Sequence, residues 1–132
     1  MRKITALCAL ALALFGAIEW RDDFDAAYEQ AKRSGKPLFV FIERHDPPCR
    51  WCEKMKKTTL ADPEVAEYIN TRYTPVRLVR ESGDYPPELR PRYVPTIYVI
   101  DGNKVVGQIT GYWEPREFWS DLKDIERKLG QK

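Results

Sequence analysis

The sequence has few of the residues from which metal centres are usually built. It contains one histidine, His45, and three cysteines, of which only Cys49 and Cys52 lie outside an apolar N-terminal segment. A closed zinc site needs about four ligands, so these three side chains are too few. We therefore expect neither a metal nor a cofactor.

Charge of one sign is not in excess either. The 22 Lys and Arg residues are nearly matched by 20 Asp and Glu residues, for a net charge of +2. Removal of Arg2 and Lys3 with the N-terminal segment would leave a net charge of about zero. No basic stripe interleaved with aromatic residues is present. The composition therefore gives no support to nucleic-acid binding.

No apolar run reaches the roughly twenty residues that cross a bilayer as a helix. The longest, Ile4 to Ile18, follows Arg2 and Lys3 and carries no charge, which is typical of a secretory signal. We expect residues 1–17 to be a signal peptide, cleaved near Ala17 or retained as an uncleaved membrane anchor. The remaining residues, 18–132, then form one domain of a protein exported to the periplasm.

The rest of the chain alternates helical and strand patterns separated by Gly and Pro. The patterns predict, in order, a helix capped by Asp22 and ended by Gly35, a buried strand over 38–42, a helix over 49–60, a helix capped by Asp62, a strand over 73–79, a short segment over 88–93, a hairpin of strands 96–100 and 104–109, and a helix from Pro115. This order implies an α/β fold with a mixed sheet of about four strands flanked by helices.

Cys49 and Cys52 carry the predicted chemistry. Three residues of helical rise bring the two sulfurs close enough to form a small disulfide ring. Helix N-terminal amides and a nearby cation, here Arg50, lower a cysteine pKa from about 8.5 into a range of about 3.5 to 7.5. We assign Cys49, at the helix start, as the exposed nucleophile and Cys52 as the partly buried resolving cysteine. The alternative of a structural bridge is weaker, because so short a loop removes little unfolded-state entropy.

Several features of the sequence resemble the thioredoxin superfamily, in particular its small exported thioredoxin-like reductases. They are the strand over 38–43 that leads into Cys49-Arg50-Trp51-Cys52, the tripeptide Val94-Pro95-Thr96 at the start of a strand, and Gly111 after the next strand. The resemblance covers about residues 20–130. It implies the thioredoxin fold and a redox-active disulfide between Cys49 and Cys52.

The resemblance also implies where a substrate binds. In that family the proline equivalent to Pro95 is cis and lies beside the redox pair, so Val94 would offer backbone hydrogen bonds to an extended substrate segment. Trp51 and Arg50, between the cysteines, are further candidates for substrate contact. Simple packing is the alternative for Trp51.

Glu43 stands six residues before Cys49, where thioredoxins carry a buried acid that shuttles the proton of the second cysteine. In a strand Glu43 would share a face with Phe39 and Phe41, so its side chain can point inward for that role, while a solvent-facing side chain is the alternative. The sequence departs from thioredoxin at Pro48, where a tryptophan is usual, and at Arg50-Trp51, where Gly-Pro is usual. The direction of electron flow therefore does not follow from the resemblance.

We expect a monomeric enzyme, a protein-disulfide reductase that acts on protein substrates with disulfides or thiols and is kept reduced by a membrane electron donor. The small size favours this by analogy, because there is no room for the helical insertion of dedicated oxidases or for the dimerisation domain of isomerases. The alternatives are an oxidant of protein thiols and a non-catalytic module that binds a partner in the groove around Pro95.

Overall fold

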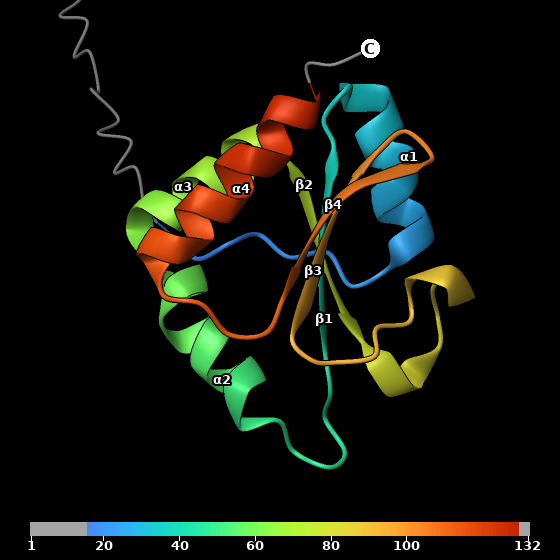
Figure 1. The fold of residues 1–132 in the computed structure, drawn as a ribbon. Helices are drawn as coiled ribbons and strands as arrows, with labels where there is room; N and C mark the ends of the chain where they lie inside the picture. The colour runs from blue at the N-terminus through green and yellow to red at the C-terminus, as the bar shows by residue number, and fades with distance from the viewer. Residues whose placement is uncertain (1–15, 130–132) are drawn as a thin grey trace, which may run out of the picture.

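The computed structural model describes residues 16–129, so most of the predicted signal peptide lies outside the described residues. The elements are α1 (Phe24–Ser34), β1 (Leu38–Glu43), α2 (Arg50–Lys57), α3 (Pro63–Arg72), β2 (Thr74–Val79), β3 (Thr96–Asp101), β4 (Lys104–Thr110) and α4 (Pro115–Leu129), as Figure 1 shows. Short 3-10 turns lie at Thr59–Ala61, Arg80–Ser82 and Pro87–Leu89. None of the helices in this range combines the length and the apolar character that a membrane crossing requires.

The four strands form one mixed sheet in the order β2-β1-β3-β4. Strands β1 and β2 pair in parallel, whereas β3 is antiparallel to both β1 and β4. The connection from β1 to β2 passes through α2 and α3, as a parallel pair requires. The predicted mixed α/β sheet is confirmed, and it places the end of β1 directly before the two cysteines.

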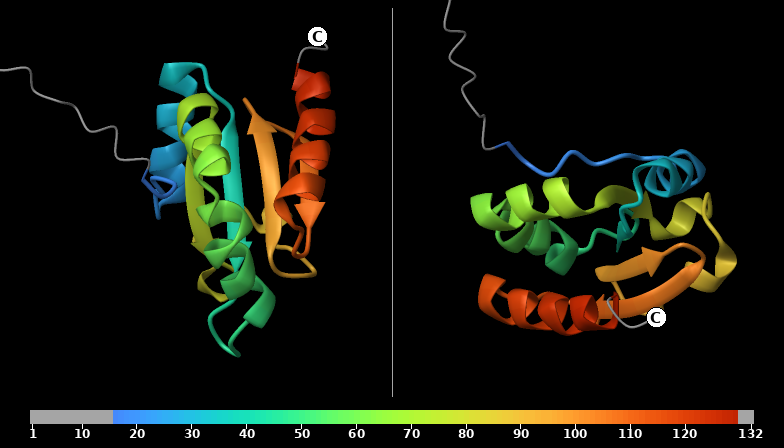
Figure 2. Two further views of the ribbon diagram at one scale, coloured as in Figure 1. Left: turned by 90° about the vertical axis from the view of Figure 1, so that its left-hand side faces the viewer. Right: turned by 90° about the horizontal axis from the view of Figure 1, so that it is seen from above.

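Helices cover both faces of the sheet, with α1 on one face and α2, α3 and α4 on the other (Figures 1 and 2). All six residues of β1 are buried, because this strand lies in the middle of the sheet. Its side chains alternate: Phe39 and Phe41 pack with α2, α3 and α4, and Val40 and Ile42 pack with α1.

Three boundaries differ from the sequence prediction. Asp23, not Asp22, caps α1 by accepting a hydrogen bond from a backbone N–H. The helix predicted over 49–60 ends at Lys57 and continues as the turn Thr59–Ala61. The segment predicted over 88–93 forms only the turn Pro87–Leu89, because the prolines nearby remove backbone donors and restrict the residues before them. The Asp62 cap of α3 is confirmed.

The packing of the domain extends back to the start of the described residues. Ile18 is buried in the core cluster that also holds Phe39 and Phe41. Asn70 of α3 donates to the carbonyl oxygen of Ala17 at 3.2 Å and accepts from the backbone N–H of Glu19 at 2.8 Å. Residues 17–19 are therefore fixed to the body of the domain.

Candidate functional site

Cys49 and Cys52 form a disulfide at the start of α2, with their Cα atoms 5.3 Å apart. Cys49 is the N-cap of the helix, and its Sγ accepts a hydrogen bond from the backbone N–H of Cys52 at 3.1 Å. The same N–H and the helix dipole would stabilise a thiolate on Cys49 after reduction. Cys49 is 6% exposed and Cys52 is fully buried, so both are more buried than the sequence predicted, and Cys49 is the more accessible of the two.

The loop between β1 and α2 is held by two sets of hydrogen bonds. The guanidinium of Arg44 donates to the carbonyl oxygen of Pro47 at 2.8 Å, and the peptide bond before Pro47 is cis. The backbone N–H groups of His45 and Asp46 donate to the carboxylate of Glu81, at 3.1 and 2.6 Å. Desolvation raises the pKa of Glu81, but these N–H donors outweigh it and lower the pKa below its usual value. Glu81 therefore connects the loop between β1 and α2 to the segment after β2 by hydrogen bonds.

Pro95 and the residue before it lie beside the redox pair. The peptide bond between Val94 and Pro95 is cis. The carbonyl oxygen of Val94 is 4.0 Å from Sγ of Cys49, and that of Pro95 accepts from the N–H of Gly111 at 2.8 Å. The start of α2, the segment before β3 and the loop after β4 thus meet at Cys49.

Trp51 is a surface residue, 45% exposed, rather than part of the core. Its ring stacks on Tyr112, with centroids 5.9 Å apart. The guanidinium of Arg50 lies 4.9 Å and the ammonium of Lys54 lies 5.4 Å from the centroid of the Trp51 ring. Trp51 and Arg50 therefore stand beside Cys49, where a bound partner would contact them. Their role in substrate binding stays a prediction.

Glu43 points inward and is fully buried. Its Oε1 accepts from the Lys56 ammonium at 2.7 Å and lies 3.2 Å from His45 Nε2, and its Oε2 lies 3.4 Å from Arg77 Nε. Burial lowers the pKa of Lys56, but the hydrogen bonds to Glu43 and Glu53 outweigh it and raise the pKa above its ordinary value of 10.5. The side chain therefore has the inward orientation rather than the solvent-facing alternative. Its role as a proton shuttle stays a prediction.

Sequence reasoning missed Glu81, Lys56 and Tyr112 as parts of this site. The contacts from Glu81 to the loop between β1 and α2 and from Tyr112 to α2 join residues far apart in the chain, so no local pattern marks them. Lys56 carried a weak signal, because it follows Cys52 by four residues and so lies on the same face of the helix.

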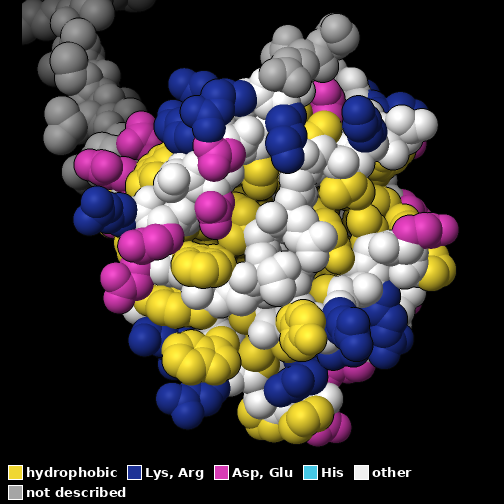
Figure 3. Space-filling model, viewed as in Figure 1, with side chains coloured by type: hydrophobic (Ala, Val, Ile, Leu, Met, Phe, Trp, Pro, Cys, Tyr) yellow, Lys and Arg dark blue, Asp and Glu magenta, His cyan; other side chains and the backbone are white. Residues whose placement is uncertain are grey.

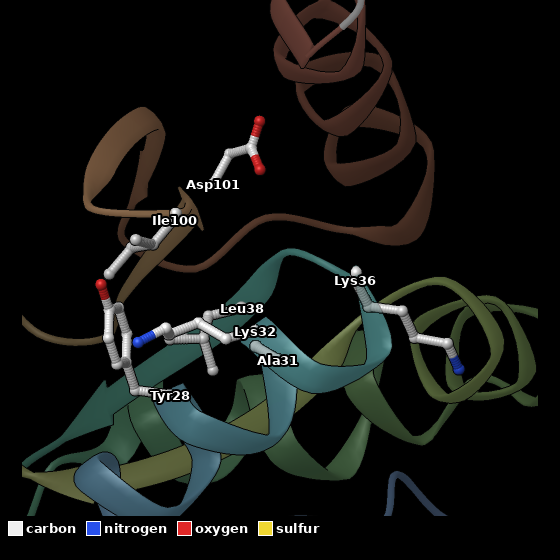
Figure 4. Close-up of a pocket in the computed structure, with 9 residues that line it drawn as sticks. Tyr28, Ala31, Lys32, Lys36, Leu38, Ile100 and Asp101 are labelled. Carbon is white, nitrogen blue, oxygen red and sulfur yellow. The ribbon is translucent and has the colours of Figure 1, made fainter.

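One cleft of the domain lies away from the site. A cleft of about 340 Å³ lies between α1 and the β3–β4 turn, at the opposite end of β1 from the cysteines. Figure 4 shows Tyr28 of α1 reaching toward Ile100 of β3 across it, with the Lys32 ammonium beside the Tyr28 ring. Within residues 16–129, no three His, Cys, Asp or Glu side chains gather in a way that could hold a metal ion.

Two curated proteins are similar to this chain in sequence. Anterior gradient protein 3 from mouse is 27% identical over 109 residues, and its human counterpart is 25% identical over 109 residues. Both alignments cover 82% of this chain. The chain spans only 65% and 64% of the length of these relatives.

The fold is also similar to solved structures. A thioredoxin from Thermus thermophilus superposes with a TM-score of 0.72 at 22% identity, covering 87% of this chain and 92% of the other. A DsbH oxidoreductase gives a TM-score of 0.66 at 20% identity, covering 85% and 86%. At these identities the likeness establishes the thioredoxin fold. The family model described as Thioredoxin-like matches residues 19–102, well over half of the chain. The chain therefore belongs to the thioredoxin-like family.

Proposed function

We propose that this protein is an exported thiol:disulfide oxidoreductase that reduces disulfides of protein substrates. The observation that carries the proposal is the Cys49–Cys52 disulfide at the start of α2, with Cys49 the less buried of the two and Val94 next to it. A short-range bridge in this position stabilises the fold little and is suited to repeated opening and closing.

In the reduced protein the thiolate of Cys49 attacks one sulfur of a substrate disulfide. A new bond joins Cys49 to the substrate, and the other substrate sulfur leaves as a thiolate. The thiolate of Cys52 then attacks Sγ of Cys49, which forms the Cys49–Cys52 disulfide and releases the second substrate thiolate. Two electrons pass from the protein to the substrate. A membrane-bound dithiol donor would restore the reduced form by the same exchange.

Cys52 must lose its proton before the second step, and Glu43 is the proposed acceptor. Glu43 binds Lys56, which lies one helical turn after Cys52 on the same face of α2. Its Oε2 is buried and has no hydrogen-bond partner among the described residues, so it can accept a proton, directly or through a water molecule. Lys56 holds the carboxylate in place.

One feature supports reduction rather than oxidation, and another supports export. Between β1 and β2 the described chain holds only α2, α3 and one short turn, without the added helical insertion of dedicated oxidases, which is an argument by analogy. Export is inferred from the basic and apolar residues 1–17. Cleavage after Ala17 would leave Ile18 in its buried position at the start of the domain.

The redox potential of the Cys49–Cys52 pair tests the proposed direction. The full chain is equilibrated in thiol buffers, and its reduced fraction is read by alkylation and gel shift. A value near about −270 mV supports a reductase, and one near about −120 mV identifies an oxidant. A pair that stays oxidised well below about −300 mV is structural and refutes the enzymatic proposal.

A Cys52→Ala variant tests catalysis separately from potential. An enzyme of either direction accumulates mixed disulfides through Cys49 in this variant, because the resolving step is lost. Cys49→Ala is the matched control and should trap nothing. A protein that traps no partner with Cys52→Ala is a binding module instead.

A further inference from the structure

Three aromatic residues lie on the segments that meet at Cys49. Trp51 follows Cys49 by two residues, Tyr93 precedes Val94, and Tyr112 follows Gly111 and stacks on Trp51. Trp51 is 45% and Tyr93 is 63% exposed, whereas Tyr112 is half-buried and packs partly against the core. Large rings left in water next to a reactive group indicate a surface that a partner covers. We refer to Trp51, Tyr93 and Tyr112 as the aromatic rim.

Each ring of the aromatic rim carries a cation. Arg50 and Lys54 lie over Trp51, Lys54 also lies 4.7 Å from the centroid of Tyr112, and Arg92 lies 5.9 Å from that of Tyr93. Figure 3 shows hydrophobic side chains and Lys or Arg side chains intermingled over the part of the surface where α2 lies. The rings hold these cations at the surface through cation–π contacts.

Within the part of the chain that the structure describes, the three cations of the rim have no acidic partner. Among residues 16–129, no carboxylate lies within 4.0 Å of Arg50, Lys54 or Arg92. By contrast, the nearby carboxylate of Glu53 is bound to Lys56 at 2.8 Å. The positive charge beside Cys49 is therefore available to a partner.

We propose that the aromatic rim and its cations select substrate segments that carry Asp or Glu within a few residues of the reacting cysteine. This inference rests on the proposed function and names its substrate class. An extended acidic segment that crosses Val94 would bring its carboxylates toward Arg50 and Lys54, at the start of α2, and Arg92, two residues before Val94. Guanidinium groups bind carboxylates by paired hydrogen bonds, and the rings cover the apolar parts of the segment.

Matched peptides test the selectivity on the reduced full-length protein. Each peptide has one cysteine joined to thionitrobenzoate in a mixed disulfide and is flanked on both sides by Glu, by Gln or by Lys. Exchange with Cys49 and then Cys52 forms the Cys49–Cys52 disulfide and releases peptide thiol and coloured thionitrobenzoate, whose absorbance gives the rate. The rate with dithiothreitol corrects for the intrinsic reactivity of each peptide.

We expect the Glu peptide to react at least about tenfold faster than the Lys peptide at low ionic strength. The ratio should fall with added salt as the Debye length shrinks from about 30 Å at 0.01 M to about 3 Å at 1 M. In the variant Arg50→Gln/Lys54→Gln/Arg92→Gln, the corrected ratio should fall to within about twofold of unity. The ratio, unlike the absolute rate, does not depend on how Arg50 affects the Cys49 thiolate.

The control variant Lys32→Gln/Lys36→Gln/Lys104→Gln removes the same charge from residues away from Cys49, at the other end of the sheet. It should keep most of the preference for the Glu peptide, and circular dichroism verifies that both variants are folded. Equal rates for the three peptides, or a preference that survives in the rim variant, overturn the selectivity while leaving the oxidoreductase proposal intact. Failure to react with any peptide overturns both.

Discussion

Replacing Lys56 by methionine should destabilise the protein, because it leaves the buried Glu43 carboxylate without its nearest cation. At an effective dielectric constant of about 20, unit charges 2.7 Å apart attract by about 6 kcal/mol, and in water by about 1.5 kcal/mol. Removing one partner of a fully buried pair costs about 3–5 kcal/mol. Lys56 is 21% exposed and Arg77 remains 3.4 Å from Glu43, so we expect a loss of about 2–3 kcal/mol.

Urea unfolding of the oxidised protein measures this loss. Lys57→Met is the matched control, since Lys57 is the exposed neighbour on α2 and its replacement should change the free energy of unfolding by less than about 0.5 kcal/mol. Glu43→Gln/Lys56→Met removes both charges and should be more stable than Lys56→Met alone. A loss below about 0.5 kcal/mol for Lys56→Met, or a double variant no more stable than the single one, would refute the reasoning.

The contribution of Lys56 to stability should depend on pH. Because the folded-state pKa of Lys56 is raised above its ordinary value of 10.5, its stabilising contribution is complete below about pH 10.5. It is lost as the pH rises through the raised pKa. The difference in the free energy of unfolding between the unaltered protein and Lys56→Met should therefore shrink above about pH 10.5, and a difference that grows there would contradict the assignment.

Other predictions concern the scaffold. A Cβ at Gly107 would lie 2.7 Å from two side-chain atoms of Ile125, so Gly107→Ala should cost about 1–3 kcal/mol in urea unfolding, and adding Ile125→Val should recover part of it. Burial and the carboxylate of Glu126 raise the pKa of Tyr68 to about 12. Stability should therefore fall between about pH 10 and 12, less so in Tyr68→Phe, as unfolding across that range would show. Asp62→Ala removes the N-cap of α3 and should cost about 1 kcal/mol in the same assay.

Much of the fold could be predicted because local patterns report burial. The unbroken apolar run that became β1 predicted a strand covered on both faces, and it is the central strand of the described sheet. In α4, Phe118, Leu122 and Ile125 are spaced by four and three residues, which is typical of a helix with one buried face, and all three are buried. The segment between β2 and β3 could not be predicted well, because its prolines exclude regular pairing without specifying which turns form.

In the candidate site too, local features could be predicted from the sequence and long-range contacts could not. The positions of Cys49 and Cys52 follow from their spacing and from the helix start, both of which are local. Glu81 and Tyr112 reach the site across contacts spanning 35 and 61 residues, counted from the residue numbers of their partners Asp46 and Trp51. Contacts of that span depend on how the sheet and helices pack, and they leave no periodic signal in the sequence.

The sequence by itself determined that the protein has an α/β domain with a redox pair at a helix start, because hydrophobic periodicity, caps and cysteine spacing act within a few residues. Only the tertiary structure decided that Glu43 points inward to Lys56 and that Tyr112 stacks on Trp51 next to Cys49. These outcomes depend on which faces of distant elements pack together. That choice is made by the burial of the whole core rather than by any single segment.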